Sequence, residues 1–82
     1  MKIWISEFQN EDGDLSFSGA HATLDGALEA LKYNTYINWD VADFNAEQVG
    51  EMWRVCMTIK NKQMKYFEHT VIYLVSEVEV GS

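Results

Sequence analysis

The chain carries one cysteine and two histidines, the side chain types most often used for nucleophilic chemistry. Cys56 could act as a nucleophile with His21 or His69 as its base. However, Cys56 stands within an alternating apolar segment, where a free cysteine usually packs like a small apolar residue. No flanking motif indicates a site that would stabilise a thiolate. We therefore expect no enzymatic activity and no catalytic residue.

Asn10, Asp12 and Asp14 have the alternating spacing of the first ligands in a calcium-binding loop. The glycine of such a loop stands two positions too early, at Gly13, and His21 replaces the bidentate glutamate that would close the site. The histidines and the cysteine do not have the spacing of a zinc motif, and the glycines are too scattered for a phosphate-binding loop. We expect no metal and no cofactor, and we interpret residues 10–14 as a solvated turn.

Charge is the strongest chemical signal in the sequence. The chain has 13 acidic and 6 basic residues, for a formal net charge of −7. Residues 1–51 contain ten acids and two bases, whereas residues 52–65 contain four bases and no acid. This balance argues against direct binding to nucleic acid or to anionic lipid, because both need clustered lysine and arginine. Whether the acidic part or the basic segment 52–65 makes the functional contact stays open.

We predict a partner-binding surface in which carboxylates surround aromatic side chains. The carboxylates would steer association with a basic partner, and the aromatic rings would supply buried area. The predicted partner-binding residues are Glu11, Asp12, Asp14, Tyr36, Trp39, Asp40 and Asp43. This prediction requires residues 10–14 and the segment near residue 40 to share one side of the domain. In the alternative interpretation, the charge only maintains solubility and the aromatic residues close the core.

We expect one domain over residues 1–82, because the chain is short and contains no linker, repeat or low-complexity segment. Apolar residues make up 48% of it, which is too many for a disordered chain. No segment approaches the roughly 18 consecutive apolar residues of a membrane span. The N-terminus lacks the pattern of a secretory signal, and a lone cysteine suits a reducing compartment. We therefore expect a cytoplasmic protein that binds no membrane.

The start of the chain has the pattern of a β-hairpin. Ile3 and Ile5 fall on one face of a strand, and Trp4 and Phe8 fall on the other. An Asp-Gly pair supplies a turn before the next alternating segment. The predicted strands cover residues 2–8 and 14–20, and the turn covers residues 10–14.

A one-sided helix should follow this hairpin. Thr23 is a suitable N-cap, and apolar residues recur at helical spacing from Leu24 to Leu31. Asp25 in the first turn and Lys32 in the last turn suit the helix dipole. We expect this helix to lie across a sheet.

Residues 33–44 follow neither the helical nor the strand period. Beyond them, Asn45 and Gln48 have the spacing of a capping box, which predicts a short helix near residues 46–51. Alternation then predicts a strand over residues 53–60 and a long partner strand from Met64 to Val80. The expected fold is α+β, with a single antiparallel sheet of about four strands and one main helix packed on it. The expected order is β-β-α-(short α)-β-β.

Three segments resemble the short acidic accessory proteins encoded by bacteriophages and prophages: Lys2–Ile5, Phe17–Leu31 and Tyr73–Val80. The resemblance implies a role in host takeover or in evasion of host defence, in the cytoplasm of the host cell. Anti-CRISPR and anti-restriction inhibitors in this group often act without catalysis, by occupying a nucleic-acid-binding surface of a host complex. The resemblance assigns no individual functional residue.

The expected function is therefore non-catalytic inhibition of a host protein or ribonucleoprotein complex that has a basic surface. The alternative is a homo-oligomeric structural or accessory protein without inhibitory activity. In that case, the first and fourth predicted strands would present sheet edges, and exposed rings such as Trp4 and Phe8 would join two copies as a homodimer.

Overall fold

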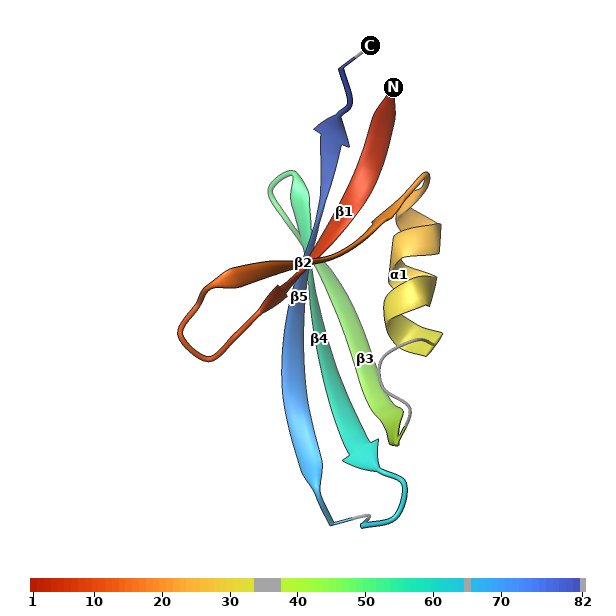
Figure 1. Ribbon diagram of the computed structural model, residues 1–82, viewed down its shortest axis with the longest axis vertical. Helices are drawn as coiled ribbons and strands as arrows, with labels where there is room; N and C mark the ends of the chain where they lie inside the picture. Colours follow the sequence, from red (N-terminus) through yellow and green to blue (C-terminus); the bar gives the residue numbers. More distant parts are fainter. Residues whose placement is uncertain (34–37, 65, 82) are drawn as a thin grey trace.

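The computed structural model describes residues 1–33, 38–64 and 66–81. Over these residues the chain has the expected α+β fold, with one antiparallel sheet and one helix. The strands are β1 (Lys2–Gln9), β2 (Leu15–His21), β3 (Trp39–Val49), β4 (Met52–Asn61) and β5 (Glu68–Glu79), and the helix is α1 (Leu24–Tyr33). The strand order is β2-β1-β5-β4-β3, so the last strand of the chain lies at the centre of the sheet (Figure 1).

The structure confirms the first hairpin, the main helix and the two C-terminal strands, but the predicted short helix near residues 46–51 is wrong. Those residues continue β3 into its hairpin with β4, which pairs from Trp39↔Asn61 to Val49↔Met52. Gly50 has a φ of +63° in the turn, a conformation that glycine adopts without steric cost. The sheet therefore has five strands in the described residues, in the chain order β-β-α-β-β-β.

A bulge in β3 explains why this strand has an irregular sequence pattern. Val41 pairs with Ile59 and Asp43 pairs with Thr58, so Ala42 is an extra residue in the ladder. The bulge reverses the alternation of side chains along the strand. As a result, Val41 and Phe44 face the same side of the sheet although they are three residues apart, a spacing that resembles a helix.

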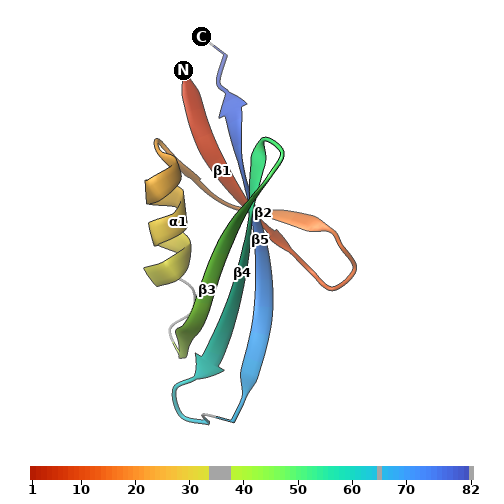
Figure 2. The same ribbon diagram turned by 180° about the vertical axis from the view of Figure 1, so that it is seen from behind.

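The two faces of the sheet differ in their cover. Helix α1 packs on one side of the sheet, no second described helix packs on the opposite side, and the end of the β1–β2 hairpin projects away from α1 (Figures 1 and 2). We call these sides the covered face and the open face. The buried core lies under the helix and consists of Ala27, Leu31, Val55, Met57, Tyr73 and Val75. Cross-strand pairing assigns these apolar residues to the open face: Ile3, Ile5, Leu15, Phe17, Val49, Met52, Ile72, Leu74 and Val78.

The helix is positioned by its cap and by its apolar side. The Thr23 hydroxyl oxygen accepts a hydrogen bond from the Gly26 amide at 3.0 Å, which confirms the predicted N-cap. Ala27 and Leu31 are buried against the sheet. At the other end, the Lys32 ammonium lies 5.8 Å from the centre of the Phe44 ring, within the range of a cation–π contact with β3.

Strands β1 and β5 are interior strands, and the sheet edges are β2 and β3. The expectation that the first and last strands present edges is therefore wrong. Trp4 and Phe8 pack against the core on the covered face, and the Phe8 ring lies 5.5 Å from the Tyr73 ring in an edge-to-face arrangement. Both rings thus pack within one copy of the chain, and they do not form the exposed surface that the homodimer hypothesis required.

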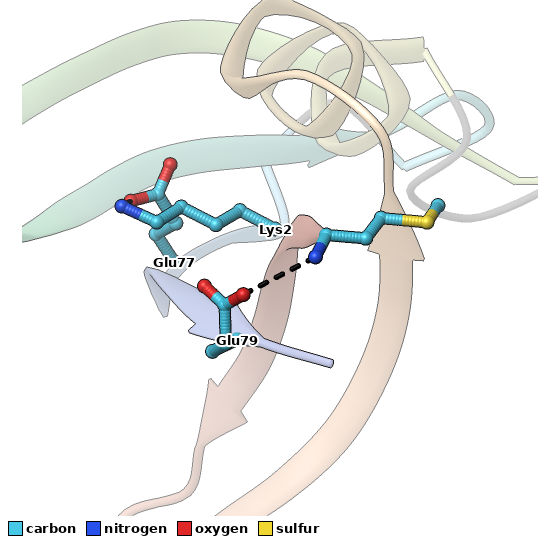
Figure 3. Close-up of polar contacts among 4 residues, drawn as sticks. Lys2, Glu77 and Glu79 are labelled. Atoms are coloured by element: carbon cyan, nitrogen blue, oxygen red, sulfur yellow. Dashed lines mark hydrogen bonds and ion pairs between the residues drawn. The ribbon is translucent and has the colours of Figure 1, made fainter. Parts of the chain in front are cut away.

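Exposed ion pairs join β1 and β5 where the two chain ends lie side by side. Lys2 Nζ lies 3.6 Å from Glu77 Oε1, and the N-terminal ammonium lies 3.2 Å from Glu79 Oε1 (Figure 3). Exposed pairs of this kind contribute roughly 0–1 kcal/mol. Their main consequence is electrostatic, because they offset two of the acidic residues at this end of the sheet.

Candidate functional site

The turn between β1 and β2 presents three uncompensated carboxylates. Asn10 Oδ1 accepts hydrogen bonds from the backbone amides of Asp12 and Asp14 at 3.0 and 2.9 Å, which fixes the turn. The side chains of Glu11, Asp12 and Asp14 are exposed, and none of them has an ion pair within the described part of the chain. This acidic turn is therefore a fixed site of negative charge.

The predicted residues on β3 have a different environment. Trp39 is half-buried, and its ring lies 5.2 Å from the ring of His69 on β5. Asp40 Oδ1 lies 3.7 Å from Lys62 Nζ, so its charge is partly offset. Asp43 is exposed and lies opposite Thr58. Tyr36, which was also predicted to contact a partner, lies outside the described residues.

The structure brings only part of the predicted surface together. The acidic turn joins β1 to β2 at one edge of the sheet, whereas Asp40 and Asp43 lie on β3 at the other edge. Strand spacings of about 4.8 Å place roughly 19 Å between the two edge strands. Asp40 and Asp43 also point to the open face, while Trp39 lies on the covered face beside His69. A single acidic surface around both aromatic residues is therefore not formed by the described residues.

Glu11 and Trp39 are instead linked through two adjoining hollows. The first has a volume of about 220 Å³ and is lined by Trp39, Ile59, His69 and Val71. The second has a volume of about 280 Å³ and lies between the acidic turn and β5; it is lined by Phe8, Gln9, Asn10, Glu11, His69, Thr70, Val71 and Ile72. His69 and Val71 belong to both hollows. An apolar pocket next to Trp39 thus shares two residues with a second hollow that an acidic residue, Glu11, helps to line.

The second hollow exists because β1 and β5 separate. Their pairing ends at Gln9↔Ile72, after which β1 turns away toward residues 10–14. The preceding residues of β5, 68–71, pair with β4 on one side, and no described strand pairs with them on the other side. We call this place the fork. A stretch of strand with one free side can add a further strand by backbone hydrogen bonds.

His69 lines both hollows, although it is not among the partner-binding residues predicted from the sequence. His69 does not meet the requirement for a base of Cys56, because the two residues lie on opposite faces of the sheet. Cys56 pairs with Ile72 on the open face, whereas His69 pairs with Ile59 on the covered face. His21 also lies on the covered face, opposite Trp4. Neither histidine is therefore placed to act on the Cys56 thiol.

The fork can recognise an extended peptide by three separate contacts. Residues 68–71 offer backbone groups to a strand, the hollow beside Trp39 accepts an apolar side chain, and the acidic turn attracts a basic one. Backbone pairing generally supplies affinity in this mode, and side-chain pockets supply specificity. Within the described residues, no three or more His, Cys, Asp or Glu side chains are grouped to hold a metal ion.

Comparisons with protein families, with curated proteins and with solved structures gave no match for this chain. The resemblance to phage accessory proteins therefore stays a prediction. In the part of the chain that the structure describes, no helix combines the length and the apolar character that crossing a membrane requires.

Proposed function

We propose that the protein is a non-catalytic binding module that holds an extended basic segment of a partner protein in the fork. The partner that fits best by charge is a nucleic-acid-handling protein or ribonucleoprotein of a host cell. Its basic segment would otherwise contact phosphate groups. Occupation of that segment by the acidic turn would exclude nucleic acid and so inhibit the partner.

The observation that supports this proposal is the position of the two hollows. They share His69 and Val71, directly beside the free side of β5, and Glu11 is one of the residues that line the second hollow. The apolar pocket and the acidic turn thus lie on opposite sides of residues 69–71 of β5, so an added strand at the fork would lie between them. A segment with both basic and apolar side chains matches this arrangement.

Charge reversal at the acidic turn tests the proposal with a matched control. The variant Glu11→Lys/Asp12→Lys changes the charge at the fork, and Glu29→Lys/Glu51→Lys makes the same change of net charge at exposed residues elsewhere. The probe is a synthetic peptide of alternating lysine and valine, and its binding is measured by fluorescence anisotropy. We expect the first variant to weaken binding at low salt by about tenfold or more, because it removes local attraction. The control variant should bind nearly as the wild type does.

Two results would contradict peptide binding in the fork. Equal weakening by both variants would mean that only the net charge matters, and absence of peptide binding to the wild type would remove the site. Added salt should also weaken the wild-type complex, because exposed charges are screened over about 10 Å at 0.1 M ionic strength.

The inhibitory part of the proposal is tested with a bacterial lysate. Proteins that are retained by the wild type and by the control variant, but lost by Glu11→Lys/Asp12→Lys, should bind DNA or RNA. Addition of the wild-type protein should release that nucleic acid. Retained proteins that keep their nucleic acid in its presence would contradict inhibition by this route.

A further inference from the structure

The open face is an apolar surface with nothing described on it. Phe17 is 68% exposed, Val49 is 48% exposed and Leu15 is 45% exposed, although all three belong to strands. A bulge in β2 contributes to this surface. Glu7 pairs with Phe17 and Ser6 pairs with Gly19, so the ladder skips one residue of β2 and both Leu15 and Phe17 face the open side.

The accessible surface of the chain is larger than a compact protein of this mass presents. The described chain has a surface of 5738 Å², whereas a monomer of 9.5 kDa is expected to have about 5,000 Å². Its radius of gyration is 13.3 Å, against roughly 12 Å for a compact domain of this length. The excess surface is close to the roughly 800 Å² that each partner contributes to a standard protein interface.

We propose that a second copy of this chain packs on the open face, so that two sheets form a sandwich with the helices outside. Packed sheets lie about 10 Å apart and keep their strands within about 30° of each other. A two-fold axis parallel to β5 would place β5 on β5, β1 on β4 and β2 on β3. Because the contact is isologous, each pairing occurs twice.

Charge on the open face selects this axis. One row across the sheet reads Phe17, Glu7, Leu74, Arg54 and Glu47, from β2 to β3. Rotation about β5 exchanges the places of β1 and β4, so Glu7 of each copy faces Arg54 of the other. Leu74 then faces its own equivalent at the centre of the row.

The neighbouring row also fits a second copy. It reads Ala20, Ile5, Ser76, Met52 and Val49. The same rotation places Ile5 on Met52 and Ala20 on Val49, so that apolar side chains meet in both pairs. The central charges and the apolar pairs of the second row are thus complementary between the two copies, whereas Phe17 meets Glu47 at the edge of the first row. The acidic turn has carboxylates and no basic residue, whereas this face carries charges of both signs, so a basic partner should bind at the turn rather than here.

Sedimentation velocity from micromolar to about 1 mM protein tests the proposal. We expect the mass to rise with concentration from 9.5 kDa to twice that value. Glu7→Arg and Arg54→Glu should each raise the dissociation constant by roughly tenfold or more, since each places like charges together twice. The double variant Glu7→Arg/Arg54→Glu should restore dimers, which separates the contact from any effect on folding.

Tyr66→Ser is the control, because Tyr66 is 80% exposed and lies in the connection between β4 and β5, away from the open face. It should leave the dissociation constant unchanged. A monomer at every concentration would overturn the proposal. So would a dimer that both single charge variants leave intact, since such a dimer would not depend on the contact between Glu7 and Arg54.

Discussion

The covered face and the open face are built from the same strands, yet they have opposite surroundings. On β4, Val55 and Met57 point to the covered face and are fully buried, whereas Met52 and Cys56 point to the open face and are half-buried. Alternation along the strand therefore sets only the side to which a residue points. Whether residues on that side are buried depends on α1, which covers only one face. The other face stays accessible to a second chain.

The largest expected difference between the faces lies in two methionines on the same strand. Met57→Ala should lower the free energy of unfolding by about 2–5 kcal/mol, because it opens a cavity in the core under the helix. Met52→Ala makes the same chemical change on the open face and should cost clearly less in dilute protein. Urea denaturation of both variants at micromolar concentration measures the difference.

Protein concentration sharpens this comparison. If a second copy covers the open face, the cost of Met52→Ala should grow with protein concentration, while the cost of Met57→Ala should stay constant. If both variants lose the same free energy of unfolding in dilute protein, the open face is already buried within a single chain.

A smaller effect is expected from the cap of the covering helix. Thr23→Ala removes the acceptor of the Gly26 amide and should cost about 1 kcal/mol. Thr23→Ser keeps a hydroxyl oxygen and is the control, with stability near that of the wild type. Hydrogen exchange should locate the loss in α1 and in the strands that it covers. An unchanged stability of Thr23→Ala would mean that the cap does not hold the helix on the sheet.

Local sequence pattern was sufficient for most elements of this fold and insufficient for β3. The sequences of α1, β4 and the first hairpin show a period of 3.6 or of two residues clearly enough to identify these elements, although a bulge shifts the register of β2. In β3, the bulge at Ala42 interrupts the alternation, and the capping-box residues Asn45 and Gln48 imitate a helix start. Pairing along the whole length of β4 overrides that local preference, and the local pattern of residues 39–49 does not report this cross-strand pairing.

The candidate site was predicted in part for a similar reason. The exposure of the acidic turn follows from its composition, and Trp39, which was among the residues predicted from the sequence, lines one of the two hollows of the proposed site. The position of His69 at the fork depends on the point at which β1 and β5 separate, after Gln9↔Ile72. That register joins residues more than sixty positions apart, so no local pattern reveals the fork.

The most direct test of the difference between the two faces uses Cys56, the one cysteine of the sequence. It lies on the open face between Asn45 and Ile72, one row away from Leu74 at the centre of the proposed contact. We expect its alkylation by iodoacetamide to slow as the wild-type protein is concentrated, and to stay fast in the Glu7→Arg variant. An alkylation rate that does not depend on concentration in the wild type would contradict the account.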